Sequence, residues 1–229
     1  MNLLAIDTAT SVFSVALGTE GGIWHFETNS GMRHSELLID TIDMLIKKSG
    51  LEPSDLEGVL CMRGPGSFTG LRIGFAAAKG LALALNIPFL SFSTLDCMAC
   101  AFSGWPGLVV PIIDAKKHAF FYALYSGGRR LCPDTDAAAP EIARSISAAL
   151  LNPGVDEKRV FLTGPGAEML YRELSGLSFF IGVNPRPARG NALSLLDLAK
   201  NADIINNSDI NAGPEYIRKS DAELFFKSW

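Results

Sequence analysis

Two parts of the sequence repeat the same order of features, and this repeat restricts the possible folds more than any other pattern in the chain. An apolar, strand-like run ends in aspartate at Leu3–Asp7 and again at Val110–Asp114. A short polar turn and a second apolar run follow in both places, at Val12–Leu17 and Ala119–Leu124, with an offset of 107 residues between the copies. Features that recur in one order at a constant spacing indicate a duplicated architecture.

Glycine-rich turns extend the repeat. Gly64-Pro-Gly66 and Gly164-Pro-Gly166 each come directly after a strand candidate and before a helix candidate, at an offset of 100 residues. Helices are expected over Ser35–Ser49, where apolar residues recur with helical spacing, and over Phe68–Leu85. Strands that alternate with helices after an initial meander predict the α/β class, with two halves that each contain a mixed sheet flanked by helices.

The segment Ser103-Gly-Trp-Pro-Gly107 is typical of a boundary between two such halves, because glycine and proline interrupt regular structure. We expect residues 1–105 to form an N-terminal half that carries partner-binding helices, and residues 106–229 to form a smaller C-terminal half. The 229 residues, 48% of them hydrophobic and 19% charged, are enough to bury a core in both.

Charge and hydropathy exclude several classes of protein. The net charge of −4 and the lack of a platform of aromatic and basic residues disfavour a standalone RNA-binding module. The longest apolar run, Ile73–Phe92, is interrupted by Lys79, Asn86 and Pro88, which favours a buried helix and strand over a membrane span. The N-terminus reaches Asp7 too soon for a signal peptide, so we expect a cytoplasmic protein without a membrane partner. The basic pairs Lys116-Lys117 and Arg129-Arg130 are typical of solvated turns.

The turn Gly64–Gly70 allows two interpretations. A helix that starts near Ser67 would direct free N–H groups at the turn, which is a ready site for phosphate. The turn is not a Walker A loop, because Gly66 and Gly70 are one residue too close together and Leu71-Arg72 replaces the required Lys-Ser/Thr pair. The small residues of the following helix favour close packing instead, either inside the domain or against another subunit. The turn is therefore a phosphate cradle or the base of a tightly packed helix.

The two strand-terminal aspartates also allow two interpretations. A carboxylate at the end of a strand can hold a metal–phosphate complex or orient water, and it can equally bind its own backbone in an Asx turn. His34, at the start of the first helix, can reach a phosphate or serve only as a cap. The candidate nucleotide-binding residues are Asp7, Thr8, His34, Gly64, Gly66, Ser67 and Asp114.

Catalytic and metal motifs are missing from the sequence. Cys97 and Cys100 form a single C-x-x-C without a second cysteine or histidine pair, and the adjoining Asp96 disfavours a thiolate. We expect reduced, half-buried thiols. Ser67 and Thr69 lack a nearby histidine-plus-acid pattern, so we assign no catalytic residue and no metal ligand.

Five segments together resemble the bacterial tRNA threonylcarbamoyladenosine biosynthesis family TsaB. They are Leu4–Thr8, Arg33–Glu36, Gly64–Arg72, Asp114–Lys117 and Pro214–Arg218. The resemblance spans the chain and is most specific in Gly-Pro-Gly-Ser-Phe-Thr-Gly and in the closing Pro-x-Tyr-Ile-Arg. It implies an actin/Hsp70-like ATPase fold of two ribonuclease-H-like halves and a role in placing a threonylcarbamoyl group on the adenosine beside the tRNA anticodon.

The resemblance also implies partners. They are a catalytic TsaD-like subunit, a TsaE-like ATPase and, when the chain is alone, a second copy of itself, with tRNA contacted only indirectly or weakly. No tightly bound cofactor is expected, and ATP or ADP with magnesium at a subunit interface is left open. The partner is expected on the helices 35–49 and 68–85, at Leu38, Ile42, Leu45, Gly70, Gly74, Ala77, Ala78 and Leu81.

One departure from the catalytic paralogue decides the functional prediction. TsaD binds its metal through a His-x-x-x-His pair, and the matching positions here are Thr94 and Met98, which cannot hold it. We therefore predict a non-catalytic partner that orders the active site of the catalytic subunit. The alternative is a nucleotide-dependent enzyme, a kinase-like phosphotransferase or a peptidase, in which Asp7, Asp114 and the glycine-rich turns bind ATP–magnesium productively.

Overall fold

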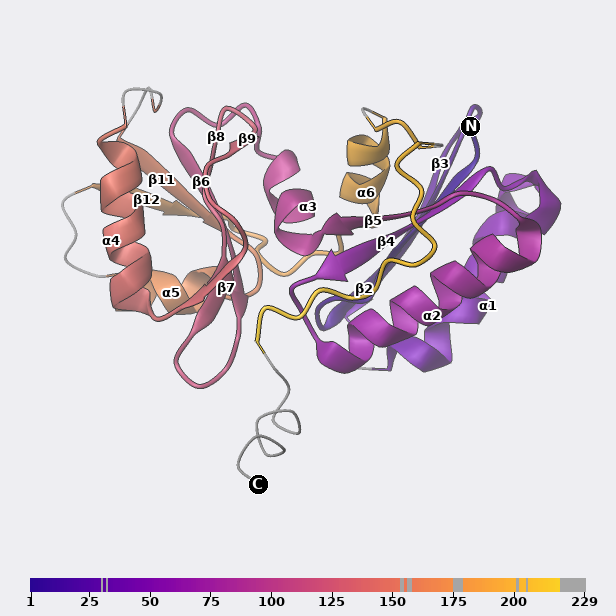
Figure 1. The fold of residues 1–229 in the computed structure, drawn as a ribbon, viewed down its shortest axis with the longest axis horizontal. Helices are drawn as coiled ribbons and strands as arrows, with labels where there is room; N and C mark the ends of the chain where they lie inside the picture. The colour runs from indigo at the N-terminus through magenta and orange to yellow at the C-terminus, as the bar shows by residue number, and fades with distance from the viewer. Residues whose placement is uncertain are drawn as a thin grey trace.

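The computed structural model describes residues 1–29, 31, 33–152, 155, 158–174, 179–200, 202–204 and 206–218. Two β-sheets lie side by side, and helices pack on both of them (Figure 1). The mixed α/β class with two sheets is the one that the sequence predicts.

The first sheet has the strand order β3-β2-β1-β4-β5. Its central strand β1 pairs antiparallel with β2 and parallel with β4. Strand β3 continues the meander on one side, and β5 pairs parallel with β4 on the other. The bounds are β1 (Leu3–Asp7), β2 (Val12–Thr19), β3 (Gly22–Asn29), β4 (Gly58–Gly64) and β5 (Phe89–Ser93).

The second sheet repeats this arrangement strand for strand, in the order β10-β7-β6-β11-β12. Its central strand β6 is antiparallel to β7 and parallel to β11, which is parallel to β12. The predicted duplication is therefore confirmed at the level of topology. The bounds are β6 (Leu108–Asp114), β7 (Phe120–Tyr122), β10 (Thr135–Ala137), β11 (Arg159–Thr163) and β12 (Phe180–Val183), with the short pair β8 (Tyr125–Ser126) and β9 (Arg129–Arg130) beside β6.

The two long helices of the first half match the expected ranges closely. Helix α1 (His34–Ser49) ends at Gly50, whose left-handed φ of 76° lets its N–H reach the carbonyl groups of the last turn. Helix α2 (Phe68–Leu85) is capped by the Ser67 side chain. By length and composition alone α2 could cross a membrane, but one side of it packs on the first sheet.

The remaining helices are shorter. They are η1 (Pro53–Asp55), α3 (Thr94–Cys100), α4 (Ala139–Leu150), α5 (Ala167–Glu173) and α6 (Ala192–Ala199). Helix α5 follows the second Gly-Pro-Gly turn as expected, and it occupies the place in the second half that α2 occupies in the first.

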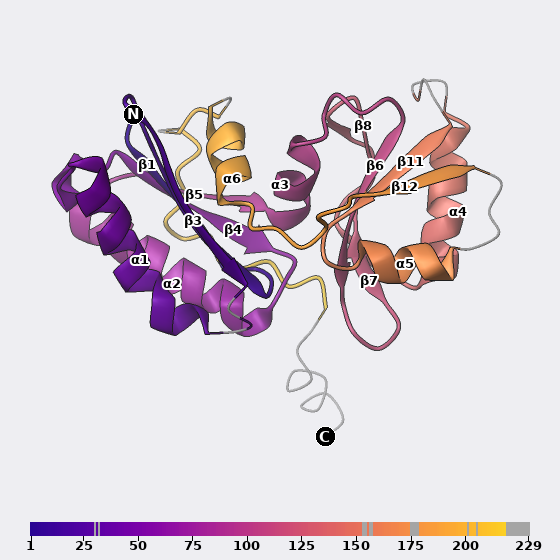
Figure 2. The ribbon, with the colours of Figure 1, turned by 180° about the vertical axis from the view of Figure 1, so that it is seen from behind.

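The chain returns to the first half after completing the second sheet. Beyond β12 it crosses back to α6, which lies on the face of the first sheet opposite α1 and α2 (Figure 2). There Leu195 and Leu196 share a buried core with Leu3 and Ala5. The division at residues 105–106 stays a prediction, to which the structure adds that α6 packs with the first half.

Candidate functional site

A cleft of about 590 Å³ separates the two halves at the ends of their central strands. The turn after β1, the start of α2 and the turn after β6 line it, together with Pro165 of the second Gly-Pro-Gly turn. Ligands of open α/β sheets bind at such carboxyl ends of parallel strands. Of the seven predicted nucleotide-binding residues, the structure brings Gly66, Ser67 and Asp114 to this cleft.

Asp7 does not face the cleft, contrary to the prediction. Its side chain is fully buried, one carboxylate oxygen accepts the N–H of Ala9 at 2.9 Å, and the other accepts the backbone N–H of Asn191 at 2.8 Å. Burial raises the pKa of Asp7, and these hydrogen bonds only partly oppose the rise. Asp7 therefore joins the end of β1 to the start of α6.

Asp114 forms the same turn in the second half. Its Oδ1 accepts the N–H of Lys116 at 2.7 Å, two residues ahead, just as Asp7 accepts from Ala9. The Lys116 ammonium lies 2.6 Å from Oδ2. Burial by itself raises the pKa of Asp114, but the hydrogen bonds and charge of Lys116 outweigh it and hold the pKa below its ordinary value. Both aspartates therefore form Asx turns. Asp7 is fully buried, whereas Asp114 is partly exposed.

His34 is a structural residue of the core. It is completely buried, its Nε2 lies 2.7 Å from the carbonyl oxygen of Thr10, and its ring stacks on Phe13 at 5.8 Å between centroids. Its side chain therefore does not reach the cleft, and its hydrogen bond to Thr10 joins α1 to the turn after β1 instead of capping the helix.

The glycine-rich turn packs against the turn after β1. The N–H of Ser67 donates to the carbonyl oxygen of Ala9 at 2.7 Å, and the Ser67 side chain accepts the N–H of Gly70 at 3.2 Å. A Cβ on Gly66 would overlap the Ala9 oxygen, and one on Gly70 would overlap the oxygen of Thr8. The glycines of the turn thus serve close packing on the backbone of Thr8 and Ala9, which favours the base of a tightly packed helix.

Most of the residues that the sequence predicts as a partner-binding face on α1 and α2 are buried inside the first half. Six of the eight are buried against the sheet of the same half, and the other two are partly buried. The six are Leu38, Ile42, Leu45, Gly70, Gly74 and Ala78, and the two are Ala77 and Leu81. The more apolar side of each helix covers the first sheet because burial there removes the most apolar surface from water.

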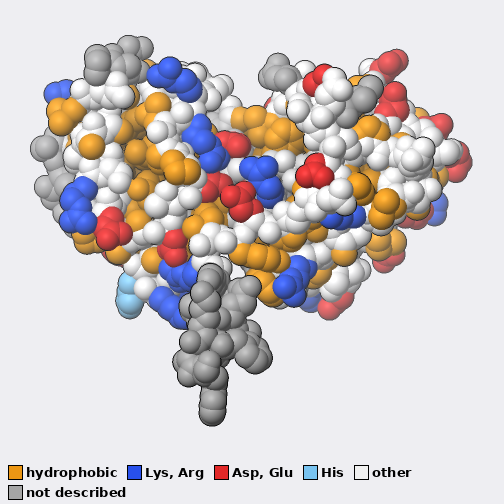
Figure 3. All heavy atoms as spheres, viewed as in Figure 1, with side chains coloured by type: hydrophobic (Ala, Val, Ile, Leu, Met, Phe, Trp, Pro, Cys, Tyr) orange, Lys and Arg blue, Asp and Glu red, His pale blue; other side chains and the backbone are white. Residues whose placement is uncertain are grey.

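Several apolar residues on the outer sides of the same helices are exposed instead. Ile39 of α1 is 61% exposed and Leu83 of α2 is 67% exposed. Ala76 and Gly80 are also exposed on α2. Figure 3 shows hydrophobic side chains among the charged ones on this half. We call Ile39, Ala76, Gly80 and Leu83 the outer helical face.

Thr94 begins α3, Met98 follows one turn later in the same helix, and both side chains are buried. Met98 packs in a cluster with Leu95, Val109 and Ile113, and Thr94 is fully buried. Within the described ranges, no group of three His, Cys, Asp or Glu side chains could hold a metal ion. The start of α3 is therefore filled by packing.

A polar cluster beside α3 was missed by the sequence analysis, which placed Arg130 in a solvated turn. The Arg130 guanidinium instead contacts Asp96 and Asp134, each at 2.7 Å, and the Ser93 hydroxyl at 3.0 Å. The Tyr125 hydroxyl donates to Asp96 at 2.7 Å. The cluster joins the end of the first sheet to the β8–β9 pair of the second half, and no local pattern in the sequence signals it.

Comparisons with known proteins agree with one another. A family model described as TsaD, tRNA N6-adenosine threonylcarbamoyltransferase, matches residues 21–186. The TsaB protein of Bacillus subtilis is 29% identical over 232 positions, which cover 97% of this chain and 96% of that one. The TsaB protein of Escherichia coli is 38% identical over 128 residues, which is 55% of both chains.

Solved structures agree on the fold. YeaZ from Pseudomonas aeruginosa has a TM-score of 0.76 at 25% identity and covers 94% of this chain and 100% of that chain. An uncharacterized protein from the same organism, described as similar to the peptidase YeaZ, has a TM-score of 0.79 at 25% identity and covers 95% of this chain and 99% of that chain.

Proposed function

The chain belongs to the TsaD family of tRNA N6-adenosine threonylcarbamoyltransferases, and from this membership we propose that it acts as a non-catalytic subunit beside a TsaD-like protein. Its relatives from Bacillus subtilis and Escherichia coli are named for tRNA threonylcarbamoyladenosine biosynthesis, and tRNA modification is accordingly the process it serves. We expect it to work in the cytoplasm with that machinery.

The observation that carries the non-catalytic role is the start of α3. The resemblance implies that the enzyme of the family carries a metal-binding histidine pair at the places of Thr94 and Met98. Here both side chains are buried, and Met98 packs among apolar neighbours such as Val109. A metal ion would have to displace this packing and would find no histidine there, so the chain contributes structure to the reaction and the partner contributes the chemistry.

The outer helical face is the proposed docking surface for the TsaD-like partner. Ile39 and Leu83 are large apolar side chains in contact with water, and exposed apolar patches usually mark partner sites. Gly80 has nothing within 4 Å of the place of a Cβ, which leaves room for a second helix to approach α2 closely. Because the partner has the same family fold, the same face also serves for pairing with a second copy when the partner is missing.

The test places a charge on this face without disturbing the fold. Gly80→Glu puts a carboxylate in open space on α2, and Gly104→Glu makes the same change at another glycine with open surroundings. We expect Gly80→Glu to lose co-purification with the TsaD-like subunit and to lower tRNA modification in a reconstituted reaction, with Gly104→Glu close to wild type. Normal binding and activity of Gly80→Glu would reject this surface.

The proposed complex also includes a nucleotide with magnesium, a TsaE-like ATPase and tRNA. ATP or ADP with magnesium would lie at a subunit interface next to the cleft that Ser67, Asp114 and Lys116 line. Calorimetry of the isolated chain and of its complex with ATP and magnesium tests this. Magnesium-dependent turnover by the isolated chain would favour the nucleotide-dependent enzyme instead.

A TsaE-like ATPase is expected to join the complex, and tRNA is expected to be held chiefly by the other subunits.

A further inference from the structure

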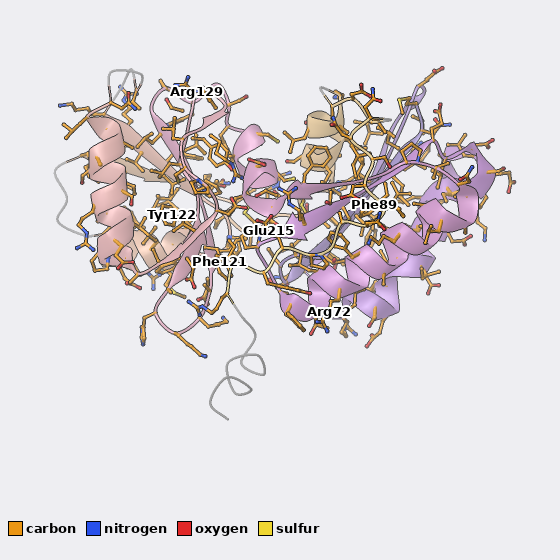
Figure 4. All side chains as sticks on the ribbon, in the orientation of Figure 1. Arg72, Phe89, Phe121, Tyr122, Arg129 and Glu215 are labelled. Carbon is orange, nitrogen blue, oxygen red and sulfur yellow. The ribbon has the colours of Figure 1, made fainter. Side chains whose placement is uncertain are left out.

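Residues 208–218 run along the first half and reach the second half at Arg218. Its Ser208 hydroxyl accepts the N–H of Phe89 at 3.0 Å, and the N–H of Asp209 donates to the Phe89 carbonyl at 3.1 Å. From this start of β5 the segment continues to the junction of the two halves. Figure 4 shows Glu215 at this junction, between Arg72 of α2 and Phe121 of β7.

Glu215 attaches the segment to the end of β4. Its N–H donates to the carbonyl oxygen of Arg63 at 2.7 Å, and its carboxylate accepts from the Arg63 side chain at 2.9 Å. A Cβ on Gly64 would come 2.7 Å from the Glu215 carbonyl oxygen, so only glycine lets the two backbones approach this closely. The side-chain pair is half exposed and contributes little alone, but the backbone hydrogen bond and the close approach to Gly64 fix the path of the chain.

Tyr216 attaches the segment to α2. Its ring lies 4.8 Å from that of Phe68, and its hydroxyl accepts from Arg72 at 3.1 Å. The Arg72 guanidinium also lies 3.9 Å from the centre of the Phe68 ring. These contacts hold Tyr216 at the first turn of the helix.

Arg218 attaches the segment to the second half. Its Nε and Nη2 donate to the two oxygens of Asp136 at 2.7 and 2.8 Å, and its Nη1 donates to the carbonyl oxygen of Ala115 at 2.7 Å. A bidentate arginine–carboxylate pair of this kind has a defined geometry, and its hydrogen bonds are stronger than those between neutral groups. Asp136 belongs to β10 and Ala115 follows β6, so both contacts lie in the second sheet.

We propose that Pro214–Arg218 is a strap that holds the two halves at a fixed angle and keeps the cleft at its present width. Glu215 and Arg218 are three residues apart, so the chain between them spans at most about 11 Å. The halves cannot rotate apart without breaking one of the two attachments. The Arg130 cluster joins the halves close to the strap. Its Ser93 pairs with Gly64, which lies beside Glu215, and its Asp134 lies two residues before Asp136, so the cluster and the strap connect the same parts of the two halves.

The strap also explains a segment that the proposed function leaves unused. The closing Pro-x-Tyr-Ile-Arg is one of the most specific parts of the family resemblance, yet none of its side chains lies on the outer helical face. Its glutamate, tyrosine and arginine are each occupied by a contact inside the chain, and these contacts divide between the two halves. The inference is independent of the docking proposal.

The experiment measures the distance between the halves in the full-length protein. Spin labels are attached to genetically encoded keto side chains at Lys48 on α1 and Arg144 on α4, both exposed, which avoids the native thiols. Pulsed electron paramagnetic resonance then gives the distance distribution. We expect Arg218→Gln and the nearly isosteric Asp136→Asn to lengthen and broaden it, and Arg218→Lys to do so less.

Arg129→Gln is the matched control, because this exposed arginine lies in β9 of the same half. It should leave the distribution unchanged. Hydrogen exchange at the Glu215 amide gives a second measurement, because this N–H should lose protection when Arg218 is changed. If Asp136→Asn folds and keeps both the wild-type distance distribution and a protected Glu215 amide, the strap proposal is overturned.

Discussion

The amide nitrogen of Ser67 donates a 2.7 Å hydrogen bond to the carbonyl oxygen of Ala9. This bond ties the first turn of α2 to the turn after β1, so two segments that are far apart in the sequence form one wall of the cleft. The glycines of the turn serve this contact, because side chains at Gly66 or Gly70 would collide with the backbone of Thr8 and Ala9.

Two glycines of α2 should respond oppositely to alanine. A Cβ at Gly70 would overlap the Thr8 carbonyl oxygen, so Gly70→Ala should lower the free energy of unfolding by about 2–3 kcal/mol. Gly80 has open space around it, so Gly80→Ala should raise the free energy of unfolding by about 0.5–1 kcal/mol through helix propensity. Urea unfolding followed by circular dichroism measures both, and equal effects of the two changes would contradict the packing described here.

Asp7 should make stability depend on pH in a defined direction. Burial raises its pKa in the folded protein above the ordinary value of 3.8, so the folded state binds its proton more tightly than the unfolded state. The contribution is fully present below pH 3.8 and is lost as the pH rises through the folded pKa. Asp7→Asn removes this titration.

The stability of wild type relative to Asp7→Asn should therefore increase on acidification from neutral pH. Urea midpoints of both proteins over a series of pH values give the difference, in which the other titrating groups cancel. A difference that shrinks toward acid pH would mean that the hydrogen bonds from Ala9 and Asn191 outweigh burial.

Arg130 should matter far more for stability than its neighbour Arg129. Arg130→Gln leaves Asp96 and the largely buried Asp134 without their cation, and we expect a loss of about 1–3 kcal/mol. Arg129 is exposed, and Arg129→Gln should stay within about 0.5 kcal/mol of wild type. Thermal unfolding of the two variants in parallel measures the difference in stability. An Arg130→Gln protein as stable as Arg129→Gln would show that the Arg130 cluster does not stabilise the fold.

The cysteines should behave as core residues. Cys61 and Cys97 are buried, and burial raises the pKa of both thiols. We expect iodoacetamide to leave these two unmodified in the native protein at mildly alkaline pH, to react slowly with the partly exposed Cys100 and Cys132, and to modify all four in urea. Mass spectrometry of digested protein reads this out. A Cys97–Cys100 disulfide formed under mild oxidation would contradict the expectation of reduced thiols.

Patterns along the chain were enough to predict the order of elements. The 107-residue offset between Asp7 and Asp114 anticipated two sheets with one topology, and the small-residue run anticipated α2 over Phe68–Leu85. These predictions rest on periodicity and on the local chemistry of turns, which a segment carries whatever surrounds it. The Asx turns at both aspartates belong to the same class, because each binds its own backbone two residues ahead.

The site could be predicted only in part. The sequence marked Ser67 and Asp114, which line the cleft, but it also marked Asp7 and His34, which are buried beside it. A strand-terminal aspartate looks the same whether it faces a cleft or a neighbouring helix. The outer helical face was missed because both sides of α2 are apolar, and composition does not tell which side the sheet will cover.

The sequence by itself determined the class of fold, the duplication, the bounds of the long helices and the family. Only the tertiary structure decided that the Asn191 backbone N–H donates to the Asp7 carboxylate, 184 residues away, and that Arg218 pairs with Asp136 across the junction of the halves. The physical reason is that local patterns depend on the geometry of a few neighbouring residues. Burial, ion pairing and access to the cleft instead depend on which distant segments are brought together, and packing decides this for the whole chain at once.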